Sequence, residues 1–319
     1  MAPETTRPRR VAALASTTIY PGARADADRC HLRAGDSDFR YDERVSGIPS
    51  GDEVRLTARE LPDWLIANGR HWVTLDQVSE LLGVPPEQVP PAMARLAGNG
   101  QVFSPLRGTY VPVPPEYRSW GAVPASHFVD AMMSHLGRSY YVGLLSAAEI
   151  HGAAHQRPQV FQVVTTGRLR DREFGRVKVE FISDAHSYER PVGAVNVPTG
   201  TMRVSTAEVT VLDLVARPDR GGGLSNVATV AGELLQDGKL NAGSLAKAAS
   251  TYRTSVIQRA GWLLDNVAGI AGVIFDTGAL LELAGRRTEP TSLVASAGRV
   301  GPVDTRWNVR VNATIEPEL

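Results

Sequence analysis

From about residue 53 onward, apolar residues recur at helical spacing, and the first such stretch, "LPDWLIANG", predicts a helix. A second apolar stripe runs from Leu75 to Leu82. Thr74 and Gln77 stand at its start with the spacing of a capping box. Gly83 follows its end, where helices often need a left-handed residue. The pattern therefore predicts a capped helix between Thr74 and Gly83.

The next helical pattern contains prolines in an unusual place. Val89, Met93 and Leu96 form its apolar face, but Pro90 and Pro91 fall beside them. A proline inside a helix removes a main-chain hydrogen bond and costs about 3 kcal/mol. We therefore expect the regular helix to begin near Val89 or Pro90, after a separate turn formed by "PPEQ".

After the stop signal "AGNG", the segment "QVFSPLRGTYVPV" predicts two short strands around a turn. The order of helices and hairpin is that of a winged helix-turn-helix. The proline-rich segment "VPVPPEYRSWG" is typical of a linker. The sequence thus predicts four parts, which are a disordered leader at 1–52, a winged helix-turn-helix DNA-binding domain at 53–113, a linker at 114–121 and a larger domain at 122–319.

The larger domain mixes both kinds of element. "ASHFVDAMMSHL" and "YVGLLSAAEIHGAAH" have apolar helical faces, whereas "QVFQVVTT" and "RVKVEFIS" have the residues of strands. "TMRVSTAEVTVLDLVARP" passes from strand to helix, with Thr206 as the expected N-cap. We therefore expect an α+β protein in which a winged helix-turn-helix precedes a mixed α/β domain.

Composition sets limits on partners and location. The 319 residues carry 34 basic and 34 acidic side chains, so any attraction to nucleic acid must come from a local surface. Cys30 is the one cysteine, which excludes an intrachain disulfide and fits a cytoplasmic protein. The apolar part of "RPRRVAALAS" is shorter than the ~7–15 residues of a signal-peptide core.

A winged helix-turn-helix reads DNA with its second helix and its wing. Gln and Arg side chains can pair with adenine and guanine, and the wing can meet phosphate. The candidate DNA-binding residues are Thr74, Glu87, Gln88, Arg95, Arg107 and Thr109. From Glu53 to Arg118, however, six arginines face seven acidic residues, which favours weak binding or use as a protein-interaction module.

The segment "GRLRDREFGRVK" concentrates positive charge in the larger domain. It is consistent with a solvated hairpin or with a basic patch that binds an acidic partner or nucleic acid. The residues of this candidate patch are Arg168, Arg170, Arg172, Arg176 and Lys178.

The sequence gives little support for a metal site or a phosphate-binding loop. His151 and His155 have the i, i+4 spacing of a metal pair, but the HExxH order and a third ligand are missing. "DRGGGLSNVATV" lacks the lysine of a phosphate loop and predicts a turn before a helix capped by Ser225. We therefore predict no metal, no cofactor and no catalytic residue.

The order of these parts resembles a known family. "RGTYVPV", "YYVGLLSAAEIHGAAHQRP", "VSTAEVTVLDLVARPDRGGGLSNVATVAGELL" and "QRAGWLLD" carry the resemblance. They are similar to the AbiEi family, the antitoxins of type IV toxin–antitoxin systems, over roughly residues 53–319. Pro90 and Pro91 depart from the polar or basic residues usual in that family's recognition helix.

The resemblance implies a role that spacing alone does not give. It implies that the winged helix binds inverted repeats upstream of its own operon and represses it. It also implies that the C-terminal domain counteracts an AbiEii-like nucleotidyltransferase toxin, with or without direct contact. Two alternatives remain, an enzyme that covalently modifies the toxin or its RNA substrate, and a ligand-responsive winged-helix regulator.

Overall fold

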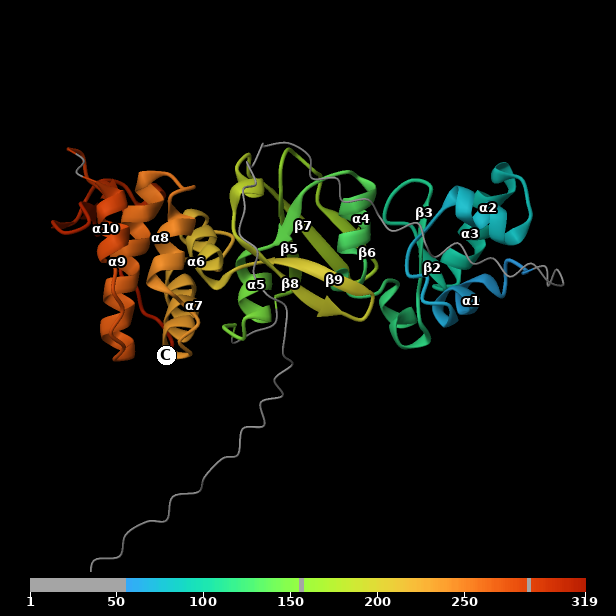
Figure 1. Cartoon of the computed structure of the whole chain (residues 1–319), viewed down its shortest axis with the longest axis horizontal. Coiled ribbons are helices and arrows are strands. Elements are labelled where there is room, and N and C mark those ends of the chain that lie inside the picture. The colour runs from blue at the N-terminus through green and yellow to red at the C-terminus, as the bar shows by residue number, and fades with distance from the viewer. Residues whose placement is uncertain (1–55, 155–157, 286–287) are drawn as a thin grey trace, which may run out of the picture. The chain divides into compact units, whose positions relative to one another are not determined.

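The computed structural model describes residues 56–154, 158–285 and 288–319, which belong to one compact unit. The predicted leader at 1–52 lies outside the described residues. The described chain combines helices with three sheets, which confirms the α+β class (Figure 1). None of its helices has the length and apolar character needed to cross a membrane.

The first part contains the three helices and the hairpin that the sequence predicted. Its elements are α1 (Leu61–Ala67), β1 (Val73–Thr74), α2 (Leu75–Leu82), the 3-10 turn η1 (Pro86–Gln88), α3 (Val89–Gly98), β2 (Val102–Phe103) and β3 (Thr109–Pro112). The three strands form a sheet in the order β1-β3-β2. The order of elements agrees with a winged helix-turn-helix, an assignment that remains a prediction.

The two helix starts in this part follow from local chemistry. At α2 the Gln77 amide donates to the Thr74 hydroxyl at 3.4 Å, and the Thr74 amide donates to the Gln77 side chain at 2.9 Å. The capping box is therefore confirmed. The prolines are accommodated as expected, because α3 begins only at Val89 and places proline in its first turn. Proline costs little there, since the first amides of a helix have no intrahelical partner.

The hairpin takes part in two apolar cores. Val102 and Tyr110 are buried with helices α1–α3, whereas Phe103 and Val111 are buried with residues from 122 onward. The Phe103 and Phe128 rings pack edge to face at 5.2 Å. The hairpin therefore connects the two apolar cores at the boundary that the sequence predicts. The division into separately folding domains remains a prediction.

The segment predicted as a linker is packed against its neighbours. It forms the 3-10 turn η2 (Pro115–Trp120). Arg118 pairs with Asp63 of α1 at 3.3 Å, and the Trp120 carbonyl accepts from the Arg176 amide at 2.8 Å. A Cβ on Gly175 would collide with that carbonyl, so glycine is required where the segment meets the turn between β6 and β7.

A six-stranded mixed sheet forms the middle of the larger part, in the order β6-β7-β5-β4-β9-β8. Its strands are β4 (Tyr140–Val142), β5 (Val160–Thr165), β6 (Arg172–Phe174), β7 (Val177–Ser183), β8 (Val192–Val197) and β9 (Gly200–Ser205). The pairs β5–β7 and β4–β9 are parallel, and the others are antiparallel. The accompanying helical segments are η3 (Ala125–His127), α4 (Val129–His135), α5 (Leu144–Ile150) and η4 (Ser187–Glu189).

Five helices follow the sheet, and α6 is the central one. They are α6 (Ala207–Ala216), α7 (Leu224–Gln236), α8 (Ala242–Ala249), α9 (Thr254–Ala271) and α10 (Gly278–Ala284). The chain ends with β10 (Thr291–Ser292), η5 (Ala295–Ala297), β11 (Val303–Asp304) and β12 (Val309–Arg310). Thr206 caps α6 as predicted, and α6 is buried from Ala207 to Val215 because it contacts the sheet and four other helices, α5, α7, α8 and α9.

One predicted cap is wrong. Helix α7 begins at Leu224 after Gly223, and no side chain caps it. Ser225 lies inside the first turn, where its hydroxyl accepts from the Glu316 amide at 3.2 Å. The reason is tertiary, because the C-terminal segment uses the hydroxyl that sequence spacing assigned to the cap.

Candidate functional site: a buried charge network beside an arginine cavity

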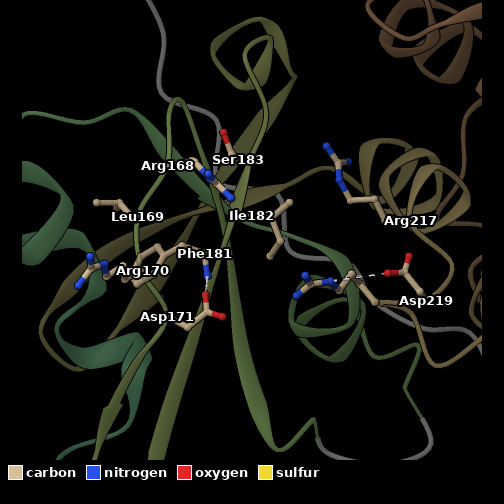
Figure 2. Close-up of a pocket in the computed structure, with 10 residues that line it drawn as sticks. Arg168, Leu169, Arg170, Asp171, Phe181, Ile182, Ser183, Arg217 and Asp219 are labelled. Carbon is tan, nitrogen blue, oxygen red and sulfur yellow. Dashed lines mark hydrogen bonds and ion pairs between the residues drawn. The ribbon is translucent and has the colours of Figure 1, made fainter.

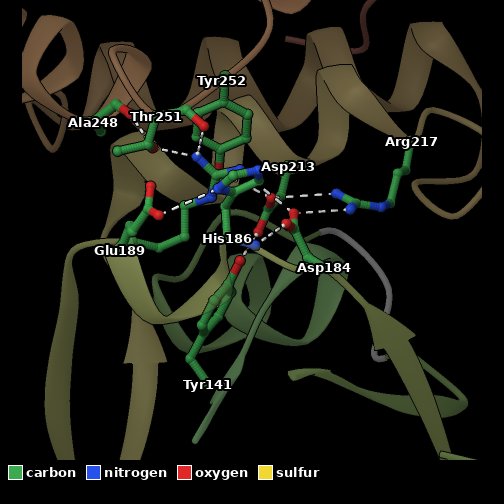
Figure 3. Close-up of polar contacts among 10 residues, drawn as sticks. Tyr141, Asp184, His186, Glu189, Asp213, Arg217, Ala248, Thr251 and Tyr252 are labelled. Atoms are coloured by element: carbon green, nitrogen blue, oxygen red, sulfur yellow. Dashed lines mark hydrogen bonds and ion pairs between the residues drawn. The ribbon is translucent and has the colours of Figure 1, made fainter. Parts of the chain in front are cut away.

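Charged side chains lie deep between the sheet and the helices (Figure 3). Asp184 follows β7, and Arg190 follows η4. Asp213 lies in the last turn of α6, and Arg217 follows directly after that helix. Together with Tyr141 of β4 and Tyr252 after α8, we call these residues the charge network. It links strands and helices that are far apart in the sequence.

Asp213 is the centre of the charge network. It is completely buried, and it accepts from the Tyr141 hydroxyl at 2.8 Å and the Tyr252 hydroxyl at 2.9 Å. Arg217 adds an ion pair at 3.4 Å. Burial raises the pKa of Asp213, while Arg217 and the two phenols oppose that rise. Burial and the neighbouring carboxylate also raise the pKa of Tyr141, so its hydroxyl stays protonated and donates.

Arg190 and Arg217 share the second carboxylate. Asp184 accepts from Arg217 at 3.0 Å and from Arg190 at 3.4 Å. Arg190 also donates to the carbonyl and hydroxyl of Thr251, and its guanidinium lies 3.4 Å from the Tyr252 ring centre. Burial raises the pKa of Asp184, but the His186 amide and the two arginines outweigh it, so the pKa lies below its usual value. The two negative charges of Asp184 and Asp213 are thus balanced by the positive charges of Arg190 and Arg217.

Beside the charge network lies a cavity of about 850 Å³, which we call the arginine cavity (Figure 2). Its charged lining consists of Arg168, Arg170, Arg217, Arg220, Asp171 and Asp219. In Figure 2, Arg168 and Arg217 approach from opposite sides, with Ile182 between them. Arg217 therefore faces the cavity while two buried carboxylates hold it from behind.

The four arginines differ in their partners. Arg220 pairs with Glu180 and lies 3.8 Å from Asp219. The exposed side chains of Arg168 and Arg170 form no ion pair or hydrogen bond within the part of the chain that the structure describes. Two unneutralised arginines therefore face a cavity that can hold an anion.

The predicted basic patch is divided by the fold. Arg168 and Arg170 line the arginine cavity, but Arg172 donates to the Pro105 carbonyl at 3.1 Å. Arg176 and Lys178 line a separate groove of about 500 Å³ next to Trp120. Arg217 and Arg220 were missed, because the sequence separates them from Arg168 by about fifty residues and only the fold brings them together.

The candidate DNA-binding residues differ in exposure and in their hydrogen-bond partners. Glu87, Gln88, Arg95 and Arg107 are exposed, and Thr74 is used in the α2 cap. Thr109 is completely buried, and its hydroxyl contacts the Leu106 amide and carbonyl inside the hairpin turn. The prediction that the Thr109 side chain meets phosphate is therefore wrong, because the turn consumes its hydroxyl.

One histidine of the i, i+4 pair, His151, has a structural role. The His151 Nε2 donates to the Ser205 carbonyl at 2.8 Å and ties the end of α5 to β9. His155 lies outside the described residues. Within 56–154, 158–285 and 288–319, no group of three potential ligands is placed to hold a metal ion.

The family comparison bears on this region of the molecule. Residues 141–266 match the family model of the AbiEi antitoxin C-terminal domain. Over these residues, about two fifths of the chain, the sequence is similar to the AbiEi antitoxin C-terminal domain. The matched segment includes the whole charge network and every residue that lines the arginine cavity.

A solved structure adds a likeness of fold to the AbiEi match. The crystal structure of the RV2827C protein from Mycobacterium tuberculosis has a TM-score of 0.56, and the match covers 82% of this chain and 94% of that one. The two sequences are 16% identical, so the likeness shows the fold alone. Comparison with curated proteins gave no match.

Proposed function

We propose that this protein is the antitoxin of a type IV toxin–antitoxin system and acts in the cytoplasm. It counteracts an AbiEii-like nucleotidyltransferase toxin, and it represses its own operon by binding inverted repeats upstream of it. The observation that carries the proposal is the AbiEi antitoxin match, which coincides with the sheet and helices built around the charge network. We further propose that it acts by binding rather than by catalysis.

Co-expression with the neighbouring toxin tests the antitoxin role. The full chain is the appropriate protein, because a fragment from Ala122 onward would lose the hairpin side chains Phe103 and Val111 from its core. We expect the full chain to restore growth in cells that express the toxin. Failure to restore growth, with the protein folded and present at comparable amounts, would contradict the role.

The basic patch is proposed as the surface that neutralisation requires. Arg168→Glu with Arg170→Glu reverses two arginines whose side chains have no polar partner in the described structure, and it leaves Arg172, which holds the hairpin turn, intact. Arg176→Glu with Lys178→Glu makes the same charge change in the separate groove. We expect the first pair to abolish rescue and the second to retain it. Rescue by a folded first variant would discard this surface.

Autorepression depends on the exposed residues of the first part. In support, Arg95 lies exposed on α3 and Arg107 on the hairpin turn. Removing a base-reading contact costs about 1–3 kcal/mol, so Arg95→Ala with Arg107→Ala should weaken operator binding roughly tenfold or more in a mobility-shift assay. Arg59→Ala with Arg70→Ala serves as the control of equal charge. If both variants weaken operator binding equally, the binding depends on general positive charge and not on specific contacts of Arg95 and Arg107.

Labelled ATP distinguishes binding from catalysis. Purified antitoxin and toxin are incubated together and separately with ATP that carries a label on either end of the triphosphate. We expect no transfer of label from ATP to the toxin that requires this protein. Transfer that requires it would favour the enzyme alternative.

A further inference from the structure

The structure assigns to the arginine cavity a ligand class that neither the family match nor the antitoxin role provides. We propose that the cavity binds the phosphate groups of a nucleotide, either free or at the end of a nucleic acid strand. The inference stands apart from the antitoxin role, because binding to the purified full-length protein is measured without a toxin.

The first argument is the chemistry of the lining. Guanidinium groups match phosphate oxygens through two parallel hydrogen bonds, and four arginines line this cavity against two aspartates. Asp171 is engaged by the Phe181 amide, which donates to it at 2.9 Å. Arg168 and Arg170 have no partner among the described residues, so an anion would be their first.

The second argument is preorganisation. The loop that carries Arg168 and Arg170 is fixed at its start by Arg138, which donates to the Thr166 carbonyl at 3.2 Å and the Arg168 carbonyl at 3.4 Å. Asp171 fixes its other end to β7. Opposite, Asp184 and Asp213 hold the Arg217 fork. Binding then requires little ordering of the loop backbone and of the Arg217 side chain, which favours affinity.

The third argument is size and polarity. About 850 Å³ lies within the ~300–1,000 Å³ range of small-molecule and cofactor sites. Phe181 and Ile182 also line the cavity, but they are almost fully buried and belong to different apolar cores, so the accessible lining is mainly polar. Ser183 beside them is exposed and offers a hydroxyl donor. A polar lining of this size with several guanidinium groups suits a chain of phosphate groups.

Calorimetric titration of the full-length protein tests the proposal with defined probes. The probes are inorganic tripolyphosphate, ATP, adenosine, a short single-stranded RNA with and without a 5′-triphosphate, and a polyglutamate peptide. We expect tripolyphosphate and ATP to bind and adenosine to bind far more weakly. RNA that binds more tightly than ATP, and only with its triphosphate, would identify a strand end as the source.

Matched variants separate a built site from general attraction. Arg168→Ala with Arg170→Ala removes two charge-assisted contacts and should weaken ATP binding roughly a hundredfold. Arg176→Ala with Lys178→Ala removes the same charge outside the cavity and should change it less than about twofold. Arg168→Lys with Arg170→Lys keeps the charge without the fork and should recover only part of the affinity.

Several results would overturn the proposal. They are the absence of binding by every phosphate probe, equal weakening by both alanine pairs, and binding of polyglutamate but not of tripolyphosphate. Circular dichroism of each variant confirms the fold, which these exposed side chains should leave unchanged. A variant that binds no ATP yet still rescues cells from toxin would separate this site from neutralisation.

Discussion

The charge network and the arginine cavity share Arg217, yet charge is arranged differently in the two regions. In the network, Asp184, Asp213 and Arg190 are nearly or completely buried, and each has several partners. In the cavity, Arg168 and Arg170 are exposed and have no partner among the described residues. The difference indicates that the first region maintains the fold, whereas the second is available to a ligand.

The largest expected effect is the loss of a buried network carboxylate. Asp213→Ala leaves two buried phenols without their acceptor and leaves Arg217 with only Asp184, and removing one member of a buried ion pair costs about 3–5 kcal/mol. Urea unfolding should show that loss. Asp219→Ala, at a side chain that is 80% exposed, should change the free energy of unfolding by less than about 0.5 kcal/mol. Similar losses in both variants would remove the contrast between the regions.

The pH dependence of Asp184 gives a second test. Its pKa lies below the unfolded value of about 3.9, so its stabilising contribution is present above that pH and is lost as pH falls through the folded pKa. Asp184→Asn should therefore lose stability less steeply than the wild type below about pH 4. Burial raises the pKa of Asp213, which contributes in the opposite sense, so only the comparison with the variant isolates Asp184. Parallel curves would contradict the assignment.

A smaller effect is expected from Tyr252→Phe. The change removes one hydroxyl that donates to Asp213 but keeps the ring against Arg190. A hydrogen bond to a charged group contributes about 1.5–3 kcal/mol, and Tyr141 and Arg217 still satisfy Asp213, so we expect about 1.5 kcal/mol. Tyr117→Phe is the matched control, because the Tyr117 hydroxyl donates to no partner among the described residues. Equal stability of Tyr252→Phe and the wild type would show that the hydroxyl does not matter.

The smallest effect on stability is expected in the arginine cavity. Arg168→Ala should change the free energy of unfolding by less than about 0.5 kcal/mol, because it removes no side-chain hydrogen bond or ion pair among the described residues. A loss above about 1 kcal/mol would place Arg168 with the network residues and remove the main reason for regarding it as a ligand-binding side chain.

Local elements were predictable wherever neighbouring residues define them. The capping box of α2, the late start of α3 and the cap of α6 follow from residues within one turn of each other. Thr109 and Ser225 were misassigned for the opposite reason. Their hydroxyls are used by the hairpin turn and by the C-terminal segment, and the Ser225 partner lies ninety-one residues away.

The sequence by itself determined the α+β class, the late start of α3 and the resemblance to AbiEi, because side-chain periodicity, caps and motifs are local properties of the chain. Only the tertiary structure decided which charges are neutralised. Asp184 and Asp213 meet Arg190 and Arg217 through a contact between a sheet and a helix, and burial in a region of low polarity makes their pairing obligatory. Among the described residues, the same fold gives Arg168 and Arg170 no ion-pair partner, which no count of charges along the chain reveals.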